Sequence, residues 1–365
     1  MPHLKNREAS FFGHGFSGGL RASSSMTMPP TCEDEPMTGS HFYSDASIAD
    51  LYTWFANETR SSSATLTRLC HWIADTAAIW PLLDSLPGQK RQPNIFLAAL
   101  RYLDAPLDPG PPFLEWVTEH WDAVRDVVLS RQTQTNEPGR CATLAPVIAS
   151  LGERIALIEV GMSAGLCLFP DRYGYRWSFE DGRVISRGSA DVTVIDCEVS
   201  GQTPPAYADY NLPNIVWRAG IDLNPLNPAD PDDARWLRAL VWPGQTERET
   251  RLANALEMAA GQDVLRVYGD ALDELPGLIK QAPDDATVVV MHTALLQYFV
   301  RERRNEFQQI VSDLPVRWIS NEGDRVLPSL RDKLTPWPGD PSFALALDGE
   351  PIARTGPHGQ FLHWL

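Results

Sequence analysis

ALIEVGMSAG, residues 156–165, combines a short apolar run, one acidic residue and two glycines four positions apart. This order predicts a buried strand that enters a tight turn and then a helix. In a nucleotide-binding crossover, such glycines let the backbone approach a cofactor, and the N–H groups at the helix start face it. In an esterase, the residues from Gly161 to Gly165 form a nucleophile elbow that exposes Ser163. The motif alone is compatible with both chemistries.

Composition limits the classes of function. The chain has 365 residues, 43% of them hydrophobic, which is enough for a large core and two domains. A formal net charge of −16 disfavours nucleic acid as a partner, because phosphate binding requires a basic face. No apolar run approaches the ~18 residues of a membrane-spanning helix, so a soluble protein without a membrane partner is expected. The five cysteines lack the paired spacing of metal ligands, which predicts no disulfide framework, no metal and a cytoplasmic location. The oligomeric state stays open.

Three regions differ in their sequence pattern. Residues 1–38 mix Gly, Ser, Pro and charges without a period, which predicts a flexible tail. Residues 39–150 carry apolar residues at helical spacing, divided by prolines, which predicts a helical domain that closes as a lid. Residues 151–365 alternate strand and helix patterns. They contain an insertion at about 172–212, where Asp181-Gly182 turns a β-hairpin.

The alternation predicts a Rossmann-like α/β domain with a doubly wound sheet. Two C-terminal strands, 343–347 and 360–364, are expected to form an antiparallel hairpin joined by a long connection. Ligands of such sheets bind at the carboxyl ends of the strands. The residues at those predicted ends are Glu159, Asp222, Asp270, His292 and Ser320. Three of the five are acids, which suits a nucleoside with hydroxyl groups and an exocyclic amine.

The order of these motifs resembles the core of S-adenosylmethionine-dependent methyltransferases. It runs Glu159-Val-Gly-Met-Ser-Ala-Gly165, Gly220-Ile-Asp222, Gly269-Asp-Ala271, a strand with His292, and a closing hairpin. The resemblance implies a methyltransferase-type sheet and S-adenosylmethionine as cofactor.

Carried over by position, the resemblance puts Glu159, Gly161 and Gly165 around the methionine part of the cofactor, with Ser163 in place of the usual middle glycine. Asp222 would bind the ribose hydroxyls, and Asp270 and Ala271 would lie beside the adenine. Asp222 is further from the turn than the ~20 residues typical of a nucleotide-binding crossover, so this assignment requires the insertion.

Four segments also resemble a bacterial family of unknown function, DUF2332. They are residues 135–137, 159–166, 240–243 and 318–323, and the similarity spans about residues 43–365. The family is grouped with Rossmann-type folds and has no settled activity. This resemblance therefore supports the fold more than a function.

His292 is the candidate for proton transfer, since a neutral imidazole at a strand end accepts a proton near neutral pH. The alternative is a structural histidine that caps the strand through a backbone hydrogen bond. A substrate carboxylate could be held by Arg140 or Arg248, although arginines on a solvated surface need no such role. The weaker candidates for substrate contacts are Asn136, Glu137, Arg140, Tyr298 and Glu322.

Two other functions compete with methyl transfer. An esterase would use Ser163, Asp270 and His358 in this chain order. However, the region before the elbow reads as helical where several strands are expected, and no glycine-rich oxyanion loop occurs outside the tail. A binding protein would keep the nucleotide pocket, or only its shape, without catalysis. The function expected from the sequence is a methyltransferase that acts on a small molecule.

Overall fold

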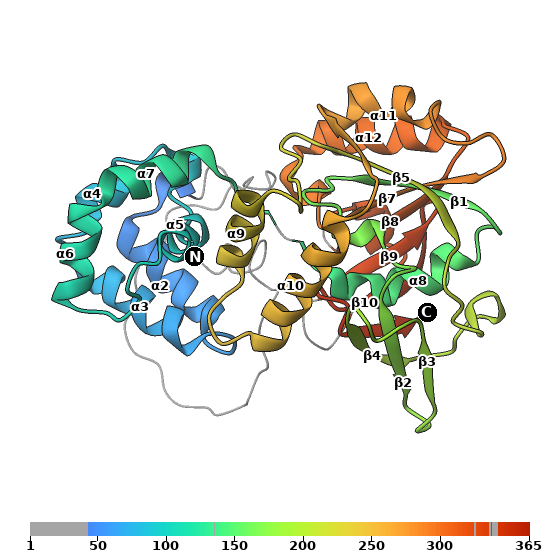
Figure 1. The fold of residues 1–365 in the computed structure, drawn as a ribbon, viewed down its shortest axis with the longest axis horizontal. Helices are drawn as coiled ribbons and strands as arrows, with labels where there is room; N and C mark the ends of the chain where they lie inside the picture. The colour runs from blue at the N-terminus through green and yellow to red at the C-terminus, as the bar shows by residue number, and fades with distance from the viewer. Residues whose placement is uncertain (1–42, 135, 325, 336, 338–341) are drawn as a thin grey trace. The chain divides into compact units, whose positions relative to one another are not determined.

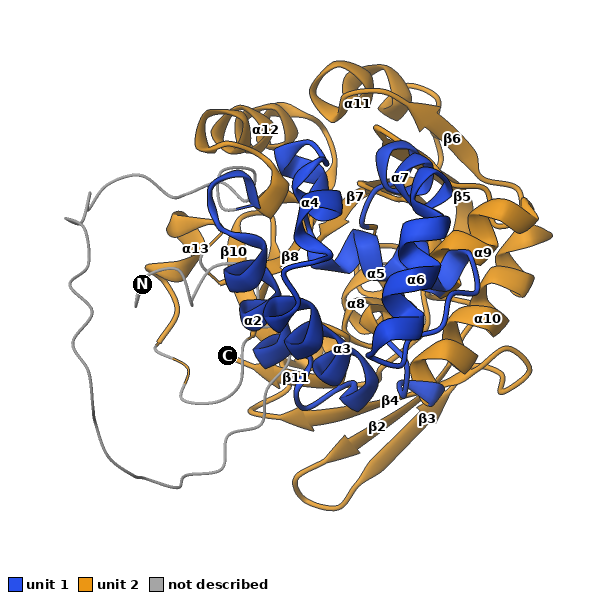
Figure 2. Ribbon diagram, turned by 90° about the vertical axis from the view of Figure 1, so that its left-hand side faces the viewer, with its two compact units in different colours: residues 1–133, 239–246 blue, residues 134–238, 247–365 orange. Residues whose placement is uncertain are grey.

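The computed structural model describes residues 43–134, 136–324, 326–335, 337 and 342–365. The predicted tail, residues 1–38, lies outside the described residues. The chain divides into two compact units, which Figure 2 shows in different colours. The first comprises residues 1–133 and 239–246, and the second comprises residues 134–238 and 247–365. Residues 134–150 thus belong to the same unit as the sheet.

The described part of the first unit is built from short helices (Figure 1). Ser47 and Ser63 cap the first two, because each side chain accepts a hydrogen bond from a backbone N–H in the first turn. Pro93 and Pro111 begin two others, at a position where a missing N–H costs nothing. The helices are α2 (Ile48–Thr59), α3 (Ala64–Asp75), α4 (Trp80–Asp84), α5 (Pro93–Tyr102), α6 (Pro111–Glu119) and α7 (Trp121–Ser130), with a 3₁₀ turn at Gly88–Lys90.

The second unit is organised around an 11-stranded sheet with the order β3-β2-β4-β11-β10-β9-β8-β7-β1-β5-β6. Strands β6, β5, β1, β7 and β8 are parallel, whereas β8, β9, β10 and β11 are successively antiparallel. Strands β4 and β2 continue parallel to β11, and β3 pairs antiparallel with β2. The strands are β1 (Ile155–Val160), β2 (Gly174–Phe179), β3 (Val184–Arg187), β4 (Val194–Ser200), β5 (Ile215–Asp222), β6 (Leu265–Tyr268), β7 (Thr287–Thr293), β8 (Arg317–Gly323), β9 (Phe343–Leu347), β10 (Glu350–Thr355) and β11 (Phe361–Trp364).

Helices α11 and α12 of this unit cover the parallel strands. Leu275 of α11 and Phe307 of α12 are fully buried in one apolar cluster with Ile158 of β1 and Val290 of β7. Figure 1 shows α11 and α12 side by side on this part of the sheet. The helices are α8 (Cys141–Ala149), α9 (Pro231–Leu240), α10 (Thr246–Ala260), α11 (Ala271–Ile279), α12 (Arg301–Asp313) and α13 (Pro328–Arg331), with 3₁₀ turns at Pro138–Arg140, Leu166–Leu168, Pro205–Tyr207 and Leu296–Tyr298.

The sheet reverses its winding direction at β1. From β1 the chain passes to β5 and β6 on one side, and later to β7 and β8 on the other side. In register, Glu159 of β1 lies beside Gly220 of β5 and Met291 of β7. In open α/β sheets the ligand crevice lies at such a switch point, outside the carboxyl ends of the strands. The topology therefore directs attention to the turn after β1.

The predicted α/β class with a large, mostly parallel sheet is confirmed. The expected turn at Asp181-Gly182 does join β2 and β3, with Gly182 at φ 84°. The insertion nevertheless extends the main sheet, because β4 pairs with β11.

Two local predictions were wrong. The supposed long connection between the last two strands contains strand β10, flanked by Gly349 and Gly356. The sequence pattern also predicts a helix from about Leu295 to Leu314, but α12 begins only at Arg301, after the 3₁₀ turn Leu296–Tyr298.

Candidate functional site

The turn after β1 has a left-handed backbone at three positions. Gly161 and Gly165 each have φ 74°, and Ser163 has φ 47°. A Cβ atom on Gly161 would lie 2.5 Å from Leu295 Cδ1, so both conformation and space favour glycine there. Leu295 consequently packs over the start of the turn. Instead of an α-helix, the single 3₁₀ turn Leu166–Leu168 follows.

Two polar side chains hold this turn. The carboxylate of Asp222, at the end of β5, accepts hydrogen bonds from Ser163 N at 2.7 Å and Asn224 N at 2.7 Å. Asn136 Nδ2 donates to Ser163 Oγ at 2.6 Å, and Asn136 Oδ1 accepts from Ala164 N at 3.1 Å. These bonds explain how a serine is kept at positive φ. Asp222 and Asn136 thus lie at the predicted site, where each supports the turn.

Glu159, one residue before the end of β1, has a buried carboxyl group. The residue is only 4% exposed, and its Oε2 atom has no hydrogen-bond partner among the described residues. Burial raises the pKa of Glu159 well above 4.5, and the charges of Cys167 and Asp222 act in the same direction, while Arg140 opposes them. Glu159 therefore favours the protonated form, which can donate a hydrogen bond.

Replacing Glu159 by glutamine should make stability less sensitive to pH. Because the folded-state pKa is raised, the wild-type protein loses stability as pH rises from 4.5 towards that pKa, by at most about 1.4 kcal/mol per pH unit. The variant lacks this loss, so its unfolding free energy relative to wild type should rise between pH 5 and pH 8. Urea unfolding at several pH values measures this difference. A difference that does not change with pH would contradict the assignment.

Asp270 begins α11 and is engaged by protein groups. Its Oδ1 accepts from Leu272 N at 3.0 Å, and its Oδ2 pairs with Arg303. Ala271, the next residue, is buried in the helix. Asp270 and Ala271, which the resemblance places beside the adenine, therefore lie at the start of a helix. There Asp270 already caps the helix and pairs with an arginine.

Each ring nitrogen of His292 has a hydrogen-bond partner in the protein. Its Nδ1 lies 2.6 Å from Glu322 Oε1, and Trp318 Nε1 donates to its Nε2 at 3.0 Å. Because Nε2 accepts a hydrogen bond from tryptophan, the ring carries a proton on Nδ1, which donates to Glu322. The same Glu322 oxygen accepts from the N–H groups of Leu295 and Leu296. His292 and Glu322 are thus buried residues that fix the loop after β7, and both ring nitrogens of His292 are engaged by protein groups.

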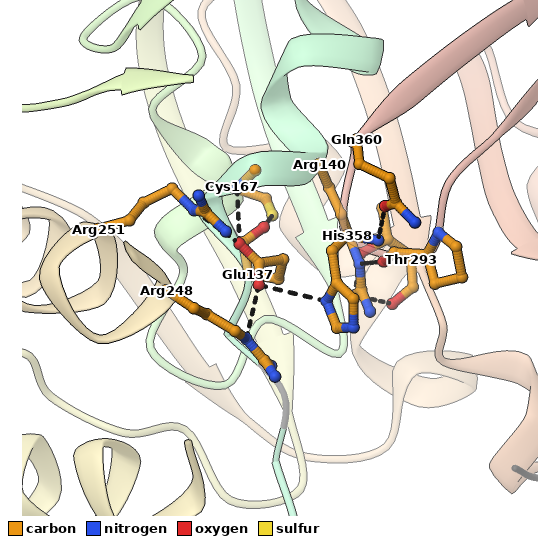
Figure 3. Close-up of polar contacts among 10 residues, drawn as sticks. Glu137, Arg140, Cys167, Arg248, Arg251, Thr293, His358 and Gln360 are labelled. Carbon is orange, nitrogen blue, oxygen red and sulfur yellow. Dashed lines mark hydrogen bonds and ion pairs between the residues drawn. The ribbon is translucent and has the colours of Figure 1, made fainter. Parts of the chain in front are cut away.

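A second cluster surrounds Glu137, whose side chain is fully buried (Figure 3). Its Oε2 lies 2.8 Å from Arg248 Nε and 3.2 Å from His358 Nδ1. Its Oε1 lies 3.0 Å from Arg251 Nε and accepts a 3.0 Å hydrogen bond from Gly139 N. Two arginines of α10 and His358, all far from Glu137 in the sequence, therefore meet its carboxylate.

The pKa values in this cluster diverge. Burial alone would raise the pKa of Glu137, but the His358 hydrogen bond and the charges of Arg248 and Arg251 outweigh it and hold the pKa well below 4.5. Burial and the charge of Arg248 lower the pKa of His358 to about 4, against the effect of Glu137. At neutral pH the pair is an ionised carboxylate beside a neutral imidazole.

Close backbone approach brings His358 to Glu137. A Cβ on Gly139 would lie 2.3 Å from His358 O, and a Cβ on Gly359 would lie 2.0 Å from Gly139 O. Gly359 also has φ 78°. Only glycine at both positions lets the segment after β10 pass so near to the segment before α8.

Arg140 anchors the same region from the other side (Figure 3). The residue is 3% exposed, and its guanidinium donates to Pro357 O at 2.8 Å and to Thr293 Oγ1 at 3.1 Å. Tyr298, in contrast, is 68% exposed and belongs to the 3₁₀ turn after β7. Of the predicted substrate residues, Glu137 and Arg140 therefore lie in one cluster, and Asn136 joins it to the turn.

The structure does not assemble the predicted esterase triad. Ser163 Oγ is bonded to Asn136, Asp270 to Arg303, and His358 to Glu137. The elbow sequence directly follows β1, which is the first strand within the described residues. An α/β-hydrolase arrangement would need several preceding strands.

The family model described as "Uncharacterized protein conserved in bacteria (DUF2332)" matches residues 49–364. The chain belongs to this family. A search of curated proteins found no match. Among the described residues of this chain, none of the helices has the length and apolarity to cross a membrane.

Arg248 is one of the two arginines that the sequence proposes for a substrate carboxylate, with a solvated surface position as the alternative. Arg251 is not predicted from the sequence. The spacing of three positions between Arg248 and Arg251 on α10 was the available signal, since it puts both side chains on one helix face.

Proposed function

We propose that this DUF2332 protein binds S-adenosylmethionine at the carboxyl ends of β1 and β5 and methylates a small molecule. The observation that carries the proposal is Glu159, whose buried Oε2 has no partner among the described residues at the switch point of the sheet. A protonated carboxyl there suits a ligand with a hydrogen-bond acceptor.

The residues present fit such a ligand in part. Asp222 uses both oxygens for backbone N–H groups, yet a carboxylate offers about four acceptor positions, so hydroxyl groups of a ribose can still bind. Leu295 packs over Gly161, so a ligand close to the turn requires that side chain to rotate. Asp270 fits least well, because Arg303 and Leu272 N already engage it.

The chain's own residues would orient the reaction and move a proton. S-adenosylmethionine, when bound, supplies an electrophilic methyl group. The imidazole of His358 is neutral near pH 7, and its Nδ1 lies 3.2 Å from Glu137 Oε2, which orients the ring. His358 is thus a better candidate than His292 for the general base that deprotonates an acceptor. Asn136 and Glu137 are adjacent, so one segment joins the turn to this histidine.

Replacing Asp222 by alanine should weaken cofactor affinity at least about tenfold, since it removes hydroxyl acceptors and releases the turn amides. Isothermal titration with S-adenosylmethionine and S-adenosylhomocysteine measures the affinity. Asp181→Ala, at the exposed β2–β3 turn, is the matched control and should bind like wild type. Equal affinity of the two variants would refute the pocket assignment.

A p-nitrophenyl ester assay on the same samples separates the competing functions. Ester turnover that is lost in Ser163→Ala would favour the hydrolase. Absence of both ligand binding and ester turnover would favour a binding protein without catalysis. Saturable binding near one ligand per chain, without ester turnover, is the expected result.

A further inference from the structure

Glu137 is surrounded by more positive charge than it can neutralise. Two arginines, Arg248 and Arg251, pair with this one carboxylate, and the neighbouring His358 is neutral near pH 7. Arg140 lies nearby, and its hydrogen bonds go to neutral oxygens of Thr293 and Pro357. The excess is local, because the chain as a whole has a formal net charge of −16.

Arg251 has unused donor groups. Its Nε is bonded to Glu137, whereas its two terminal NH₂ groups make no hydrogen bond with described residues. The side chain is 21% exposed, so these groups can meet a ligand. Arg248 shares its helix face, and its side chain is 17% exposed. A guanidinium held by a carboxylate at Nε keeps its other edge oriented, which is the geometry that binds an oxyanion through paired N–H groups.

We propose that Arg251 and Arg248, oriented by Glu137, bind the oxyanionic head group of a small molecule, a carboxylate or a phosphate. The two head groups share the oxygen pairs that a guanidinium recognises. Arg140 adds positive charge to the same region and favours an anion over a neutral ligand. The proposal does not depend on cofactor binding. If the methyl transfer proposed above also holds, the site places an anionic acceptor beside His358.

Titration calorimetry with inorganic phosphate, succinate and benzoate tests the site, with neutral succinamide and benzamide as matched probes at constant ionic strength. At least one anion should bind saturably, and its neutral partner should not. Arg251→Gln should weaken binding at least tenfold. Arg251→Lys should weaken it less, because lysine keeps the positive charge but lacks the paired N–H groups of a guanidinium. Binding of phosphate alone or of carboxylates alone identifies the head group.

Arg176→Gln is the control, since Arg176 forms an exposed ion pair with Asp196 on the far strands β2 and β4. It should bind anions like wild type. No saturable anion binding by the wild-type protein would overturn the proposal and leave the arginines as a clamp on Glu137. Equal binding by Arg251→Gln and wild type would overturn it as well. S-adenosylmethionine titrated into the same variants reports on the cofactor pocket separately.

Discussion

Replacing Glu137 by glutamine should lower the free energy of unfolding by about 3–5 kcal/mol. The carboxylate is fully buried, and both of its oxygens face cationic side chains. Removing one partner of a buried ion pair leaves the other charge uncompensated in a medium that solvates it poorly. Glutamine retains one oxygen for Gly139 N, so the loss reports mainly the charge.

Urea unfolding at pH 7 measures this loss, and Asp196→Asn is its control. The Asp196–Arg176 pair is exposed on both sides, so its removal should cost less than about 1 kcal/mol. Similar losses in the two variants would show that the buried cluster contributes no more than a surface pair.

The effect of Glu137→Gln should also depend on pH. The folded-state pKa of Glu137 lies well below 4.5, so its contribution is present above pH 4.5 and is lost as pH falls through the folded-state value. The difference between variant and wild type should therefore shrink in acid. A constant difference across that window would argue against an ionised, paired carboxylate.

The parallel core was predictable because its signals are local. A β-branched run at 287–291 and the apolar run before Gly161 both report strands buried on two faces, and their order in the chain implies the winding of the sheet. Strand β10 was missed for an equally local reason. Its flanking glycines and Pro351 resemble a loop, whereas pairing with β9 and β11 on both sides makes it a strand.

The environment of His292 follows from register that a sequence does not display. His292 pairs with Ser320 across β7 and β8, so Trp318 and Glu322, two residues before and after Ser320, point to the same face of the sheet. Both then reach the imidazole. Once adjacency of these strands is known, a structural histidine is the expected outcome, but adjacency itself depends on tertiary contacts.

The Glu137 cluster was beyond local reasoning. His358 reaches Glu137 only because Gly139 and Gly359 allow two distant segments to touch, and Arg248 and Arg251 arrive on a helix from a third segment. Glu137 and Arg140, which the sequence predicts as substrate contacts, lie in this cluster, but the partners that define their chemistry could not be predicted.

Replacing His358 by glutamine should lower the rate constant of methyl transfer by about 10²–10⁴-fold and leave S-adenosylmethionine affinity unchanged. General-base assistance contributes a factor of this size, and glutamine cannot accept a proton at neutral pH. Single-turnover transfer from radiolabelled S-adenosylmethionine to an anionic acceptor, selected by the titrations above, measures the rate. His292→Gln should instead reduce stability, since both ring nitrogens of His292 have buried protein partners.

The pKa of His358 gives this assignment a readout other than rate. Burial and the charge of Arg248 lower that pKa and Glu137 raises it, so Arg248→Gln should raise the imidazole pKa from about 4 in a nuclear magnetic resonance titration. The pH at which transfer fails on the acid side should rise in parallel, because a protonated imidazole cannot act as the base. A rate profile that stays fixed while the imidazole pKa moves would remove His358 from the reaction and leave it as a partner of Glu137 alone.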